Sequence, residues 1–81
     1  MTKEDIVTQV NKLFRITLEN ELLVITETTK ADDVEEWDSL THIQLVVAIE
    51  RHFKIKFTTA EIQGWYTAGD IFESIAKRLQ E

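Results

Sequence analysis

The chain has 81 residues, and nine lysines and arginines against fifteen aspartates and glutamates give a formal net charge of −6. This acidic balance opposes binding to nucleic acid or to an anionic membrane surface, because both depend on clustered cations. The absence of cysteine excludes disulfides, thiolate metal sites and thiol nucleophiles. A hydrophobic content of 43% is typical of a packed domain, and we expect one domain over residues 1–81.

No segment has the length expected of a membrane-spanning helix. The longest unbroken apolar runs are residues 22–25 and 45–49, far short of the roughly 20 residues that span a bilayer. The first five residues mix both charges and lack the apolar stretch of a secretory signal. We therefore expect an acidic, cytoplasmic monomer that is not inserted in a membrane.

The first predicted helix begins near Thr2. Asp5 follows this threonine by three residues, which approximates a capping box. Apolar residues then recur at helical spacing, at Ile6, Val10, Leu13 and Phe14.

A second helix is predicted from Asp38 or Ser39 to about Phe53, with an unusually broad apolar surface. A short third helix is indicated by the capping box of Thr58 and Glu61, and Gly64 is expected to end it.

The last predicted helix begins after Thr67. Asp70 stands near its positive end, and three apolar residues at helical spacing are expected to be buried, namely Ile71, Ile75 and Leu79. Because no segment alternates convincingly at period two, we predict an all-α fold. It is a small four-helix bundle with three longer helices, a short third helix and a long loop between the first two.

The predicted loop, residues 19–37, is longer than most loops in compact domains. Residues 22–25 are too apolar to remain in water, so we expect the loop to be pinned to the helices. Residues 19–38 hold eight acids and one base, for a net charge of −7. The acids lack the alternating ligands and the glycine of a calcium loop. We expect a solvated acidic segment and no metal site.

The start of the second helix is the candidate functional segment. Asp38 is a suitable N-cap, and Trp37 before it can fold back on the helix as a hydrophobic staple. Ser39 lies in the first turn, where backbone N–H groups favour an anion. Ser39 and His42 share a helical face, but the nucleophile elbow of a hydrolase is absent. The plain alternative is that Ser39 is one more capping residue.

A wider pattern surrounds this serine. The Asp38-Ser39-Leu40 tripeptide is followed by apolar residues at Ile43, at 46–49 and at Phe53, and residues 67–71 read T-A-G-D-I. The whole pattern resembles the acyl carrier protein family, in particular the stand-alone bacterial carriers that read W-D-S-L-T-H. The resemblance implies that Ser39 carries a phosphopantetheine arm and that Asp38 and Leu40 belong to its recognition motif.

The function implied by this resemblance is that of a carrier and not of an enzyme. A phosphopantetheinyl transferase would move the arm from coenzyme A to Ser39, making a phosphoprotein whose cofactor thiol holds an acyl group as a thioester. Partner enzymes of lipid or polyketide biosynthesis would load and use this cargo. The alternatives are an aminoacyl or peptidyl carrier, charged by an aminoacyl-loading enzyme, and a helical interaction domain that is never modified.

The second helix also contains a candidate recognition stripe. At 100° per residue, Leu40, Gln44, Val47 and Arg51 lie on one face, away from the face of Val46, Ile49 and Phe53 that is expected to enter the core. This helix resembles that of the carriers of fatty-acid synthesis, but those carriers have acids where this chain has Thr41, Gln44 and Arg51. Glu50 is the one acid kept, and we include it among the candidate partner-recognition residues. We therefore expect general fatty-acid synthase enzymes to act on this chain inefficiently, and we expect it to have a dedicated set of partners.

Overall fold

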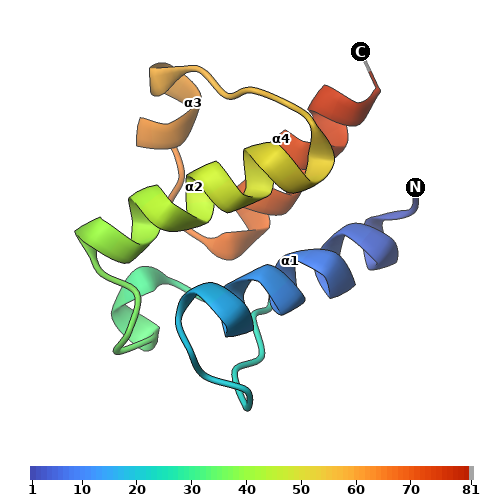
Figure 1. The fold of residues 1–81 in the computed structure, drawn as a ribbon. Coiled ribbons are helices and arrows are strands. Elements are labelled where there is room, and N and C mark those ends of the chain that lie inside the picture. Colours follow the sequence, from blue (N-terminus) through green and yellow to red (C-terminus); the bar gives the residue numbers. More distant parts are fainter. Residues whose placement is uncertain (81) are drawn as a thin grey trace.

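The structure is a computed structural model that describes residues 1–80. Within these residues the regular elements are all helices, and there is no strand (Figure 1). The elements are α1 (Lys3–Thr17), the short 3-10 helix η1 (Ala31–Asp33), α2 (Ser39–Phe53), α3 (Thr59–Gln63) and α4 (Ala68–Leu79). The prediction of an all-α bundle with a short third helix and a long first loop is confirmed. Helix α1 packs against both α2 and α4, and α2 runs back along α1 (Figure 1). No helix within residues 1–80 has the length and apolarity needed to cross a membrane.

Each α-helix begins with a capping box. In α1 the Thr2 hydroxyl accepts the Asp5 N–H while the Asp5 carboxylate accepts the Thr2 N–H, both at 3.1 Å. The same reciprocal pattern starts the other three α-helices, at Asp38 and Thr41, Thr58 and Glu61, and Thr67 and Asp70. Such a box satisfies N–H groups that have no partner within the helix. Four helix starts are thus determined by residues three positions apart.

The core is built from one face of each long helix. It contains Ile6, Val10 and Phe14 of α1, Leu45, Ile49 and Phe53 of α2, and Ile71, Phe72 and Ile75 of α4. Two expected core positions are wrong. Val46 is only half-buried, because α2 turns the neighbouring Leu45 toward α1 instead. Leu79 is 38% exposed, because it lies in the final turn of α4, where the packed layer ends, and Phe72 takes a place in the core.

The loop between α1 and α2 is pinned by a buried amide. The side chain of Asn11, on the inner face of α1, accepts the Ile25 N–H at 2.6 Å and donates to the Ile25 carbonyl at 3.0 Å. The amide therefore pairs with this loop residue as a neighbouring strand would. Ile25 is 1% exposed, and Leu23 packs partly against the core, whereas Leu22 is 90% and Val24 65% exposed. The prediction that residues 22–25 anchor the loop is confirmed, with Ile25 as the anchor.

The loop also closes the start of α4. The Gly69 N–H donates to the Glu27 carbonyl at 3.0 Å, and the Ala68 N–H donates to the Thr29 carbonyl at 2.8 Å. Two N–H groups of the first turn, which have no partner within the helix, are thereby satisfied. A Cβ atom at position 69 would lie 2.6 Å from the Glu27 carbonyl oxygen. Only glycine lets the loop backbone approach α4 this closely.

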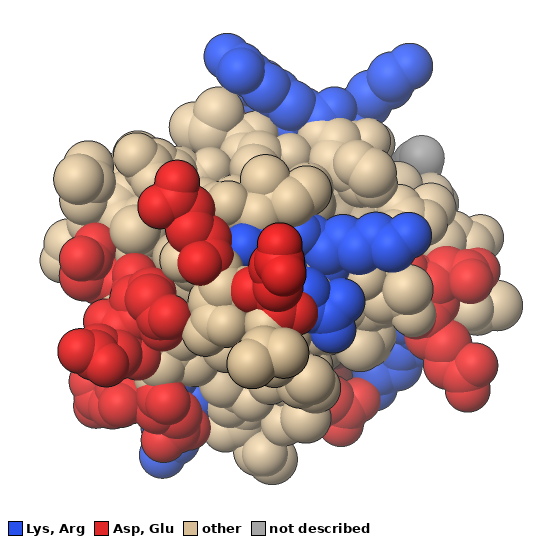
Figure 2. All heavy atoms as spheres, turned by 60° about the horizontal axis from the view of Figure 1, so that its bottom comes forward, with Lys and Arg blue, Asp and Glu red and all other residues tan. Residues whose placement is uncertain are grey.

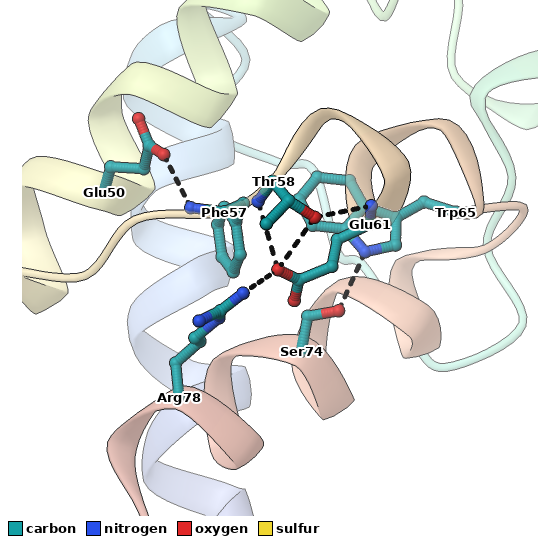
Figure 3. A network of polar contacts seen from close by, with 7 residues as sticks. All are labelled: Glu50, Phe57, Thr58, Glu61, Trp65, Ser74 and Arg78. Carbon is teal, nitrogen blue, oxygen red and sulfur yellow. Dashed lines mark hydrogen bonds and ion pairs between the residues drawn. The ribbon is translucent and has the colours of Figure 1, made fainter. Parts of the chain in front are cut away.

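Helix α3 is held by polar contacts on both sides (Figure 3). Glu50 of α2 accepts the Phe57 N–H at 2.9 Å just before α3 begins. Glu61 of α3 forms an ion pair with Arg78 of α4. The bond to Arg78, followed by the bond from the Thr58 backbone, lowers the pKa of the Glu61 carboxyl to about 2. Trp65, after α3, donates from its indole nitrogen to the Ser74 hydroxyl at 2.9 Å. This five-residue helix is thus fastened by its polar contacts.

Candidate functional site

The start of α2 presents a rigidly capped serine. The Asp38 carboxylate accepts the Thr41 N–H at 2.9 Å, and the Thr41 hydroxyl accepts the Asp38 N–H at 2.8 Å. The Thr41 hydroxyl also lies 2.8 Å from the Glu36 carbonyl, to which it can donate. The bond from the Thr41 backbone lowers the pKa of the Asp38 carboxyl, so this cap is ionised at neutral pH. Asp38 is the N-cap, as predicted, and Ser39 is the first residue of the helix.

Ser39 is accessible from solvent. Its side chain is exposed, and its hydroxyl makes no hydrogen bond within residues 1–80. It borders an open surface depression of about 460 Å³, lined by Ala31, Asp32, Trp37, Asp38, Ser39 and His42. The hydroxyl is therefore available to an enzyme that approaches the start of α2, while the capping is done by its neighbours.

Trp37 fixes the end of the loop and the state of His42. Trp37 is 7% exposed and meets the Phe14 ring edge-on, with ring centroids 5.0 Å apart. Its indole N–H donates to His42 Nδ1 at 3.1 Å, and the two rings stack. The predicted staple is thus formed with histidine as its helical partner. Burial lowers the pKa of the His42 imidazole from its ordinary value of 6.5, so the ring is neutral at pH 7.

This bond also bears on the hydrolase alternative. Because an indole nitrogen only donates, Nδ1 of His42 carries no proton, and the proton of the neutral ring is on Nε2. A general base for a serine nucleophile needs an unprotonated nitrogen that accepts from the hydroxyl. Nδ1 is occupied by Trp37 and Nε2 is protonated, so this arrangement does not activate Ser39.

The recognition stripe predicted on α2 lies at the surface. Leu40 is 66% and Val47 40% exposed, and Gln44 and Arg51 are also exposed. The predicted stripe left out Ile43, which is 62% exposed and extends the apolar part of this face. Its position three residues after Leu40 and four before Val47 was the signal for it.

Glu50 lies apart from this stripe. Its side chain is 15% exposed, and its carboxylate faces Lys56 and the Phe57 N–H in the connection to α3. The structure therefore gives this carboxylate a role in holding the α2–α3 connection, away from the exposed face of α2.

Acidic side chains gather around the start of α2. Figure 2 shows them on the side of the molecule where the α1–α2 loop leads into that helix. Residues 19–38 carry the net charge of −7. Within residues 1–80 no three acidic or histidine side chains are grouped closely enough to hold a metal ion. The charge forms an acidic surface beside Ser39.

Comparison with known proteins gives a similarity that extends over nearly the whole chain. No model of a protein family matches the sequence, and no curated protein matches it. The structure is similar to the solution NMR structure of a holo acyl carrier protein from Geobacter metallireducens, with a TM-score of 0.87 and 35% sequence identity. The similarity covers 91% of this chain and 85% of that one. With this identity over nearly the full length of both chains, and with the same arrangement of helices, this chain belongs to the acyl carrier protein family.

Proposed function

We propose that this chain is an acyl carrier protein that bears a phosphopantetheine arm on Ser39 and presents an acyl group to partner enzymes. The observation that carries the proposal is the exposed Ser39 hydroxyl of an Asp-Ser-Leu motif at the first position of α2. The similar structure is that of a holo carrier, which supports the same reading.

The residues around Ser39 suit a phosphodiester. First-turn N–H groups of α2 favour an anion near this position. Thr41 has its N–H occupied by the Asp38 carboxylate, whereas the Ser39 side chain stays exposed beside an open depression. When bound, the arm supplies a thiol, which this chain lacks, and that thiol carries the cargo as a thioester. Ser39 would hold the arm, with Asp38 and Leu40 read as its recognition motif.

The attachment step places one bond on Ser39. The Ser39 oxygen bonds to the pantetheine-side phosphorus of coenzyme A, and the bond from that phosphorus to the bridging oxygen of the pyrophosphate breaks. The nucleotide portion leaves with the bridging oxygen. The hydroxyl proton passes to a base on the phosphopantetheinyl transferase, because His42 offers no free acceptor nitrogen toward Ser39.

The test is intact-mass measurement after incubation with coenzyme A and a broad-specificity transferase. The parent protein is expected to gain the mass of one arm and Ser39→Ala to gain none. Ser39 and Ser74 are the two serines of the chain, so Ser74→Ala is a matched control that should be modified like the parent. Loss of a capping residue costs about 0.5–2 kcal/mol, and Asp38 remains as the cap, so Ser39→Ala should fold.

Two outcomes of this experiment contradict the proposal. An arm found on the Ser39→Ala protein would move the attachment site elsewhere. An unmodified parent protein would favour the helical interaction domain. Charging the holo protein with an acyl-loading or an aminoacyl-loading enzyme then separates an acyl carrier from a peptidyl carrier.

We also propose that the exposed face of α2 selects a dedicated set of partners. Its apolar residues are Leu40, Ile43 and Val47, and its polar positions are the neutral Gln44 and the positive Arg51. Enzymes whose basic patch binds acidic residues at these positions would be attracted less strongly to this helix. A charge mismatch at the rim of an interface mainly slows encounter and suppresses wrong partners. The acidic surface beside Ser39 would still attract basic enzymes from a distance.

A further inference from the structure

His42 carries an N–H group for which residues 1–80 provide no acceptor. Its Nδ1 receives the Trp37 indole N–H at 3.1 Å, so the proton of the neutral ring is on Nε2. Nε2 makes no hydrogen bond to any residue of the described chain 1–80. The ring is only partly exposed to solvent. The Nε2 atom is not sealed from water, so its N–H group remains available to a ligand that binds beside the candidate modification site.

The direction of this donor is held by aromatic rings on two sides. The imidazole stacks on Trp37 with centroids 6.0 Å apart and an interplanar angle of 23°. It also meets the Trp65 ring edge-on at 6.1 Å and 78°. Trp37 is itself buried against Phe14. Flipping the imidazole would break the bond to Trp37, so Nε2–H is fixed before any ligand arrives.

The donor lies beside the candidate attachment point. His42 follows Ser39 by three positions, which puts both side chains on one face of α2, and both line the depression of about 460 Å³. The ionised or ionisable side chains that line it besides His42 are Asp32 and Asp38, and no lysine or arginine does. An anion held there is repelled by two carboxylates, and the His42 N–H is the side-chain donor left to attract it.

We propose, on the basis of the proposed attachment to Ser39, that His42 Nε2–H donates a hydrogen bond to a phosphodiester oxygen of the arm. The contact orients the base of the arm against the Trp37 side of the depression. His42 is then a binding residue for the cofactor, and Trp37 is the positioning residue that fixes its tautomer. Neither residue takes part in bond making.

The first measurement compares apo and holo protein by NMR, with the mass of each sample verified. In the apo protein the imidazole ¹⁵N signals should report a proton on Nε2. A nearby anion stabilises the imidazolium, so the pKa of His42 should rise by about 0.5 or more on conversion to the holo form. Asp32 and Asp38 are present in both samples and cancel in this difference. A phosphodiester does not itself titrate near neutral pH, so its ³¹P signal should follow the His42 titration.

Three variants separate the hydrogen bond from the packing. His42→Phe keeps a ring between Trp37 and Trp65 but has no donor, and its holo ³¹P signal should be independent of pH. His42→Gln keeps a donor and an acceptor. Its ³¹P signal should lie nearer to the parent's neutral-pH value than the signal of His42→Phe does. His52→Phe is the matched control, because His52 is exposed ten residues further along α2 and has its Nε2 2.6 Å from Gln9 Oε1. It should leave the ³¹P titration of the parent unchanged.

The inference fails if a mass-verified holo sample shows the same His42 titration as the apo protein. It also fails if the apo imidazole carries its proton on Nδ1. The comparison of apo and holo parent protein needs no variant, so a poorly folded His42→Phe protein does not remove the test. Failure of the proposed function appears separately, as a parent protein whose mass does not change with coenzyme A and transferase.

Discussion

Irregular backbone between α1 and α2 buries Ile25, Val34 and Trp37 almost completely, whereas the regular helix α2 leaves Leu40 and Ile43 more than 60% exposed. Connecting segments ordinarily run over the protein surface, but the apolar residues 22–25 already predicted that this one packs against the helices. Helix α2 buries its opposite face, with Leu45, Ile49 and Phe53. Secondary structure therefore does not decide burial here. Position decides it, since the loop is bonded both to α1 and to the start of α4, while the side of α2 with Leu40 and Ile43 is exposed.

The difference shows which part of the chain supplies stability and which is available for contacts. Burial of a side chain such as Ile25 contributes about 1.5–3 kcal/mol relative to leaving it exposed, and Asn11 adds two hydrogen bonds to its backbone. On the exposed face of α2, the side chains of Leu40, Ile43 and Val47 contribute no comparable burial energy in the isolated chain. Exposed apolar residues beside Ser39 are consistent with a surface used by partners.

The largest effect on stability is expected within the loop itself. Ile25→Ala should lower the free energy of unfolding by about 2–5 kcal/mol, because it empties a buried site. Leu22→Ala is the matched control, since Leu22 lies in the same apolar run but is 90% exposed, and its effect should stay within about 0.5 kcal/mol. Urea midpoints of both proteins measure the difference. Equal midpoints would mean that the loop is not anchored by Ile25.

A somewhat smaller loss is expected when the pin is removed from the helix side. Asn11→Ala leaves the buried N–H and carbonyl of Ile25 without their partner, and an unsatisfied buried group costs about 1–3 kcal/mol. Amide hydrogen exchange at Ile25 should accelerate together with the loss of stability. Slow exchange of the Ile25 amide in a stable Asn11→Ala protein would show that another group holds the loop.

Helix α3 differs from the loop, because an ion pair between Glu61 and Arg78 holds it in place. The pKa of the Glu61 carboxyl is about 2 when folded, against an ordinary value of 4.5. Between these values the unfolded chain binds the proton more readily, so the ion pair stabilises the fold fully above pH 4.5 and loses this contribution as the pH falls toward 2. Denaturant titrations of parent and Glu61→Gln should therefore differ at neutral pH and converge near pH 2. The effect of Asn11→Ala, a neutral substitution, should not follow this pattern, and a constant Glu61→Gln difference would contradict the ion-pair explanation.

The smallest effect is expected on the exposed face of α2, and it concerns rates. Gln44→Glu combined with Arg51→Glu should raise loading by a fatty-acid synthase malonyl transferase several-fold at low salt, with a smaller gain at high salt. Thr41 is kept, because its hydroxyl closes the capping box at Asp38.

The control for this rate is the same change of charge on another helix. Lys77→Glu with Gln80→Glu places it at the end of α4, where both residues are exposed, and should leave the loading rate close to that of the parent. If the parent is already loaded as fast as the α2 variant, the charges of this face do not select partners.

Local sequence was sufficient for the helix starts and for the candidate attachment site. A capping box needs two residues three positions apart, so Thr2 with Asp5 and Thr58 with Glu61 could be read from the chain alone. The Asp38-Ser39-Leu40 motif is equally local. The exposure of Leu40 and Val47 followed from helical periodicity, because the opposite face of α2 is more apolar.

Tertiary structure decided what depends on residues far apart in the sequence. Leu45 and Val46 are both apolar, and only the packing of α1 chose Leu45 for the core. The pairing of Asn11 with Ile25 joins residues fourteen positions apart. Gly69 is required by a loop carbonyl more than forty residues earlier in the chain. Helix periodicity and capping are set by neighbours in the chain, whereas burial and the pairing of buried polar groups are set by which elements meet.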